Sequence, residues 1–158
     1  MAIILDGKET ARKVRESLKT KVEELKQRNI FPRLAVIMVG DDGASKIYVK
    51  NKSKACEELG IEYEEFLLKA DITQEELIDL INKLNERKDV HGILLQSPIP
   101  KHLDINEAFR TIKPEKDVDG FNPVNVGKLV LGQETFISCT PFGVIKLLEE
   151  YNIPIEGK

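Results

Sequence analysis

The sequence predicts an α/β domain of three layers, in which helices cover both faces of an open, mostly parallel sheet. Three short runs of strand character, residues 33–40, 61–69 and 91–96, alternate with segments of helical periodicity. Strands that alternate with helices in this way are joined by right-handed crossovers. A chain of 158 residues with 41% hydrophobic and 32% charged residues has the composition of a single globular domain.

The first predicted helix covers residues 6–29, where apolar side chains recur every three or four positions. These are Ala11, Val14, Leu18, Val22 and Leu25. A short apolar run over residues 33–40 predicts the first strand, and residues 44–56 are expected to form the second helix. Within that helix Tyr48 and Lys52 are four residues apart, which places them on one face.

The middle of the chain predicts two further strands with a helix between them. Residues 61–69 have the composition of a strand, and residues 91–96, "HGILLQ", form a third apolar run. Between them, residues 73–87 have the pattern of a helix, and Thr73 is placed to cap its first turn.

The last third of the chain is expected to be less regular. Residues 105–113 predict a short helix, and residues 114–141 are rich in Asp, Asn, Gly and Pro, which predicts irregular chain. A final helix is expected to start at Pro141, because proline suits a first helical turn, and to run to Asn152. Residues 153–158 are expected to form a strand or the beginning of a linker.

Charge and composition exclude several classes of partner. The 27 acidic and 24 basic side chains give a net charge of −3 and are spread along the chain, so we expect no nucleic-acid partner. The apolar stretch at the start is too short for a signal peptide, and no run could span a membrane. The sequence therefore predicts a cytoplasmic protein without a membrane partner.

The two cysteines, Cys56 and Cys139, are far apart and have no metal-ligand spacing. We therefore expect no disulfide framework and no metal site. Both cysteines are predicted to be free and buried, as is common for this residue type.

Ligands of an open parallel sheet usually bind beyond the carboxyl ends of its strands. Here those ends are the loops "VGDDGAS" and "LQSPIP", and Gln96 belongs to the second loop. From spacing alone, two interpretations of Tyr48 and Lys52 are open. They form either a half-buried tyrosine beside a solvated lysine, which is the commoner case, or one side of a ligand cleft.

Four separated motifs occur in an order and spacing that carry a specific resemblance: "YVKNKSKACEELGI", "GILLQSPIP", "PEKDVDGFNPVNVGKL" and "CTPFGVIKLL". Together they resemble the amino-terminal catalytic domain of the bifunctional methylenetetrahydrofolate dehydrogenase/cyclohydrolase family. The resemblance implies that residues 1–158 are a folate-binding catalytic domain and that an NADP-binding Rossmann domain follows residue 158. The parent enzyme would oxidise methylenetetrahydrofolate with NADP and hydrolyse the methenyl product to formyltetrahydrofolate.

The resemblance also implies site residues. It makes Lys52 the main catalytic group, with Tyr48 beside it on the substrate, Gln96 in contact with the lysine and Asp119 holding the pterin. Further residues implied are Val49, Leu95 and Ser97 in the substrate pocket, and Pro141 and Gly143 at a hinge between domains. Ser97 departs from the leucine that many members of the family have there.

Each of these roles has a chemical reason. A lysine that is partly removed from water can exchange protons nearer to neutral pH than a solvated one. A glutamine amide can accept from an ammonium group and donate to water, without adding charge. A carboxylate can accept two parallel hydrogen bonds from a pterin, and a tyrosine ring can stack on the aminobenzoyl group of folate. Without the resemblance, a surface amide that caps a loop is the commoner interpretation of Gln96, and Asp119 could equally be a turn residue.

The sequence has no GxGxxG-like phosphate loop, so the resemblance places NADP in the missing domain rather than in this chain. We therefore expect folate binding, weak cyclohydrolase activity at most and no dehydrogenase activity from this chain alone. The alternative is a truncated, noncatalytic module that folds and binds folate. The parent is expected to be a homodimer and this piece a monomer.

Overall fold

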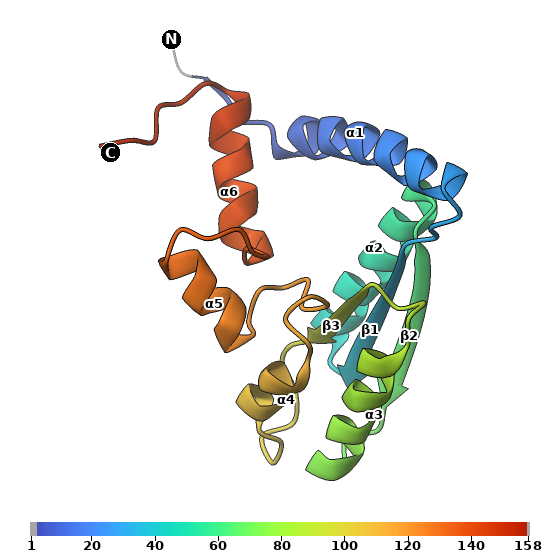
Figure 1. The fold of residues 1–158 in the computed structure, drawn as a ribbon. Coiled ribbons are helices and arrows are strands. Elements are labelled where there is room, and N and C mark those ends of the chain that lie inside the picture. The colour runs from blue at the N-terminus through green and yellow to red at the C-terminus, as the bar shows by residue number, and fades with distance from the viewer. Residues whose placement is uncertain (1–2, 158) are drawn as a thin grey trace.

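The computed structural model describes residues 3–157 and confirms the three-layer α/β fold (Figure 1). Its sheet contains β1 (Arg33–Val39), β2 (Glu62–Leu68) and β3 (Gly92–Gln96), which are all parallel and lie in the order β2-β1-β3. The chain steps from β1 to β2 and then returns past β1 to β3. Right-handed crossovers of this kind place the two connecting helices on opposite faces of the sheet.

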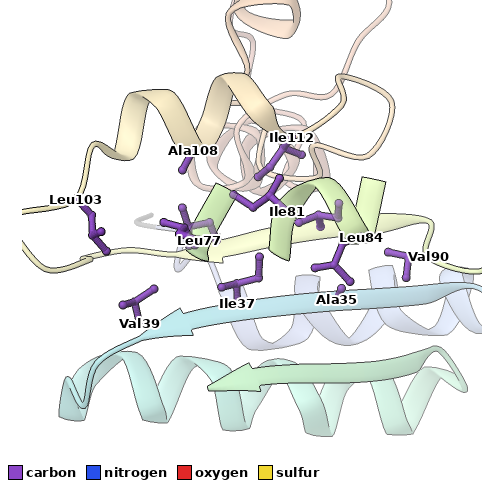
Figure 2. Packing of buried hydrophobic residues seen from close by; sticks show 12 residues of the cluster. Ala35, Ile37, Val39, Leu77, Ile81, Leu84, Val90, Leu103, Ala108 and Ile112 are labelled. Carbon is purple, nitrogen blue, oxygen red and sulfur yellow. The ribbon is translucent and has the colours of Figure 1, made fainter. Parts of the chain in front are cut away.

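The larger core lies on the face of the sheet that is covered by α3 (Gln74–Glu86) and α4 (Ile105–Thr111). Figure 2 shows Ala35, Ile37 and Val39 of β1 pointing toward Leu77 and Ile81 of α3. All five side chains are almost fully buried. Burial of this apolar surface is the main stabilising contribution to the domain.

The opposite face carries a smaller core beneath α2 (Gly43–Leu59). It consists of Val36 and Met38 of β1, Leu94 of β3 and Val49 of α2. Because successive strand residues face opposite sides, β1 supplies both cores and is buried along most of its length.

Polar groups define the starts of the helices. The Asp6 carboxylate accepts from the backbone amides of Lys8 and Glu9 and begins α1 (Gly7–Gln27). Thr73 and Glu76 form a reciprocal capping box at α3, which confirms the predicted cap. At the other end of α3, the Lys116 ammonium group donates to three backbone carbonyls.

Two predictions for the last third of the chain are wrong. The segment predicted as irregular contains α5 (Pro123–Val130), which starts where the Asn122 side chain accepts from the amide of Val124. The final helix, α6 (Cys139–Glu150), begins two residues before Pro141. Residues 153–157 form no strand, and Lys158 lies outside the described residues.

Helix α1 runs between α6 and α2 (Figure 1). At one end the Asp6 amide donates to the Tyr151 hydroxyl at 2.8 Å, and Lys13 forms an ion pair with Glu150. Among residues 3–157, no helix is both long and apolar enough to cross a membrane.

Candidate active site

A cleft of about 770 Å³ lies on the α2 side of the sheet. One wall is α2, the floor is formed by β1 and β3, and the other wall is formed by residues 118–121 and 136–140. This volume is within the usual range for small-molecule sites. The cleft runs from the carboxyl end of β3 toward the amino ends of β1 and β3, where Leu34 and Gly92 line it.

Lys52 and Gln96 meet inside this cleft. The Lys52 Nζ donates a hydrogen bond of 2.7 Å to the Gln96 Oε1. The Gln96 Nε2 donates at 2.7 Å to the carbonyl of Ser97, which fixes the direction of the amide group. The amide oxygen therefore points to the ammonium group, because its nitrogen is held by the backbone.

Asp119 lies on the wall opposite α2. Burial raises the pKa of its carboxyl group, whereas the Cys139 thiol and the positive charge of Lys52 lower it. The net shift is upward, as expected for a carboxylate that has lost water more than it has gained partners. Lys52 and Asp119 therefore face one cleft as an opposite pair of charges.

Tyr48 is one turn before Lys52 on α2 and lines the same cleft. Its side chain is 61% exposed, so the ring is more open to solvent than the half-buried tyrosine that the spacing suggested. An exposed ring on a cleft wall can stack on a planar ligand.

The structure separates the other predicted site residues into three groups. Ser97 lines the cleft, and so does Leu95, although its side chain packs in the core on the α3 side. Val49 does not line the cleft, because it is on the buried side of α2 at 2% exposure. Pro141 and Gly143 lie in the first two turns of α6, directly after the cleft residue Thr140.

The prediction of two buried thiols holds for one of them. Cys56 is buried, and burial raises the pKa of its thiol. Cys139 is exposed, so that part of the prediction is wrong. It is the first residue of α6, a helix that contains no buried residue, and its Sγ donates to the Val118 carbonyl at 3.6 Å.

Two parts of the site differ from the sequence prediction. The loop "VGDDGAS" after β1 does not line the cleft, whereas "LQSPIP" after β3 does. Sequence reasoning missed the wall formed by Phe121, Phe136 and Ser138, all in a segment predicted as irregular. The sequence feature that could have indicated this wall is Gly120, because a glycine there allows the backbone of its turn to approach the backbone of residues 136–138.

The start of α2 does not suit a dinucleotide phosphate. The amino terminus of α2, where a dinucleotide phosphate would be expected, carries Asp41 and Asp42. The Asp42 carboxylate accepts from the Ser45 amide and hydroxyl, each at 2.7 Å, and these bonds lower its pKa. A fixed negative charge at this position repels phosphate. Within residues 3–157 there is also no group of three His, Cys, Asp or Glu side chains that could hold a metal ion.

Known proteins with similar sequences belong to one family. Residues 5–119 match the family described as "Tetrahydrofolate dehydrogenase/cyclohydrolase, catalytic domain". The chain is 56% identical over 156 residues to "Bifunctional protein FolD" of Methanosarcina mazei, covering 98% of this chain and 54% of that protein. It is 54% identical over 157 residues to the protein of the same name from Acetivibrio thermocellus, covering 99% and 55%.

Solved structures agree with these matches. The bifunctional FolD methylenetetrahydrofolate dehydrogenase/cyclohydrolase of Campylobacter jejuni has a TM-score of 0.97 at 52% identity, covering 99% of this chain and 56% of that chain. The Trypanosoma brucei enzyme, solved with NADP cofactor and an inhibitor, has a TM-score of 0.94 at 35% identity, covering 99% and 54%. The chain thus spans about half the length of the curated relatives it matches. It belongs to the tetrahydrofolate dehydrogenase/cyclohydrolase family, and residues 5–119 match the catalytic domain of that family.

Proposed function

We propose that this chain is the folate-binding catalytic half of a methylenetetrahydrofolate dehydrogenase/methenyltetrahydrofolate cyclohydrolase. The observation that carries the proposal is the 2.7 Å contact between Lys52 and Gln96, in a cleft that Asp119 lines from the opposite side. Family membership gives these residues a substrate class, a reduced folate with a one-carbon group. The protein would act in cytoplasmic one-carbon metabolism and supply formyltetrahydrofolate for purine biosynthesis.

In the proposed hydrolysis, water adds to the bridging carbon of the methenyl cation, and one carbon–nitrogen bond then breaks. A proton leaves the attacking water, and another reaches the departing nitrogen. Lys52 is positioned to carry these protons, because Gln96 holds its ammonium group inside the cleft. Gln96 accepts from the lysine and leaves the net charge of the site unchanged.

Recognition of the folate is assigned to the two walls. The Asp119 carboxylate would accept from the amino and ring N–H groups of the pterin. The exposed Tyr48 ring would stack on the aminobenzoyl group, near enough to Lys52 to share the substrate with it. Leu95 and Ser97 would complete the pocket beside Gln96, where a serine leaves a smaller apolar wall than a leucine would.

Hydride transfer is assigned to the complete enzyme, and we derive no step of it from this chain. An NADP-binding domain after residue 158 would supply the nucleotide site, and Pro141 and Gly143 would form the hinge between the two domains. We propose a homodimer for the parent and a monomer for this chain. A second domain over the cleft would exclude water and strengthen the electrostatic effect of the site on the reaction.

The proposal is tested by titrating the protein with tetrahydrofolate in a calorimeter and by following the decay of methenyltetrahydrofolate. Lys52→Met should lower the enzyme-dependent decay rate by about 10²-fold or more, as for the loss of a general acid or base. Lys50→Met is the matched control, because Lys50 is an exposed lysine of the same helix that does not line the cleft. Equal rates for wild type and Lys52→Met would refute the catalytic role. Binding without any turnover would favour the alternative, a noncatalytic folate-binding module.

A further inference from the structure

Asp119 belongs to a turn, residues 117–120, whose first residue is held by a buried network of polar side chains. Asp117 is only 2% exposed, and its Oδ2 accepts from the Asn122 amide at 2.8 Å and from the Asn125 Nδ2 at 2.9 Å. The Asn125 Oδ1 in turn accepts from the Thr135 hydroxyl at 2.8 Å. A buried carboxylate is tolerated only with such donors, so the network fixes where the turn begins.

The same turn is held from the other side by residues 136–139. The backbones are so close that a Cβ atom added to Gly120 would lie 2.9 Å from the Phe136 carbonyl oxygen and 3.0 Å from the Ser138 nitrogen. The Cys139 thiol adds a hydrogen bond of 3.6 Å to the Val118 carbonyl, in the peptide unit that precedes Asp119. The residues on both sides of Asp119 are therefore anchored, while its own carboxylate faces the cleft.

We infer that Asp117 and Cys139 are positioning residues for Asp119. Asp117 orients it through the backbone of the turn, and Cys139 through the Val118 carbonyl and through its contact with the Asp119 carboxyl group. The inference rests on the proposed function, in which Asp119 binds the pterin, and it adds two residues to which that function gives no role. A carboxylate that accepts two parallel hydrogen bonds must be held in one direction, and a small rotation of its backbone would break one of them. Neither contact with the turn requires the ligand.

The first test uses the protein without ligand. The amides of Gly120 and Asn122 bond to the carbonyl and carboxylate of Asp117, so their hydrogen exchange reports on the turn. Cys139→Ala removes the thiol donor and should speed exchange of these amides by about two- to tenfold, as for the loss of one net hydrogen bond. Cys139→Ser retains a donor and should restore the slower rate. Unchanged exchange in Cys139→Ala would overturn the role of Cys139.

The Asp117 side needs an indirect variant, because removing that carboxylate leaves two buried donors unpaired and threatens folding. Thr135→Val keeps the shape of the side chain and removes only its bond to Asn125. It should also speed exchange of the Gly120 and Asn122 amides, and unchanged exchange would overturn the role of the network.

The second test measures tetrahydrofolate binding by calorimetry in the same variants. Cys139→Ala and Thr135→Val should each weaken binding by about two- to tenfold, and Cys139→Ser should bind within about twofold of wild type. Faster exchange without weaker binding would overturn the positioning role. If wild type itself does not bind tetrahydrofolate, the proposed function fails. The exchange data alone then decide whether Asp117 and Cys139 hold the turn.

Discussion

Replacing Gly120 by alanine tests how closely the turn that carries Asp119 approaches the start of α6. Gly120 has φ +69°, a conformation that costs an alanine about 1 kcal/mol. Its added Cβ would also lie 2.9 to 3.1 Å from three backbone atoms of residues 136–138, which cannot rotate away as a side chain can. Such overpacking costs about 1–3 kcal/mol, so the expected total is about 2–4 kcal/mol.

Gly132 provides the matched control, because it has nearly the same conformation, φ +66°, and nothing within 4 Å of an added Cβ. Gly132→Ala should therefore cost only the conformational part, about 1 kcal/mol. Equilibrium unfolding in urea measures both variants on the same scale. Equal destabilisation by the two substitutions would refute the close approach of the two backbone segments.

Three further predictions concern charge, pH and the core. Lys116→Met removes hydrogen bonds of 3.0, 2.8 and 2.7 Å to the end of α3 and should cost about 2–4 kcal/mol in urea unfolding. Lys113→Met removes an exposed ion pair and should cost much less than Lys116→Met in the same assay. The raised pKa of Asp119 means that acidification protonates it earlier than an ordinary aspartate. In calorimetric titrations, the affinity for tetrahydrofolate should weaken as the pH is lowered, because protonated Asp119 can no longer accept two hydrogen bonds. Asp119→Asn should abolish the pH dependence that Asp119 causes. Ile81→Ala, at a fully buried position, should lower unfolding stability by about 2–5 kcal/mol, and a cost below that of an exposed substitution would contradict the assigned core.

Most of the fold could be predicted because its elements carry local patterns. The buried run of β1 and the capping box of α3 are both visible in the sequence, and the structure confirms them. Helix α5 was missed although Asn122 and Pro123 are local start signals, because its eight residues are too few to show a helical apolar period. The hydrogen bonds of Asn125 to Asp117 and Thr135 depend on how the turns around this helix fold, and no sequence pattern reveals those partners.

The candidate site was predictable to the extent that the family motifs covered it. Tyr48, Lys52, Gln96 and Asp119 line one cleft, although their roles there stay predictions. Val49 was wrongly placed in the pocket because it follows Tyr48 in the sequence. Successive residues of a helix point about 100° apart, so Val49 faces the core. The exposure of Cys139 could not be predicted, since it depends on how α6 sits against the rest of the chain.

The way in which α6 is attached makes the two walls of the cleft mechanically unequal. Helix α2 is anchored in a core, whereas α6, with 12 residues and a length of about 18 Å, contains no buried residue. Its far end is held to α1 by a hydrogen bond from the Asp6 amide to the Tyr151 hydroxyl and by an exposed ion pair between Lys13 and Glu150, both of which are weak contacts. The near end of α6, which carries Cys139 and Thr140 into the cleft, is held by the bond from Cys139 to the turn that contains Asp119. The wall opposite α2 therefore depends on contacts at the two ends of α6, whereas Tyr48 and Lys52 are on a helix that is anchored along its buried face.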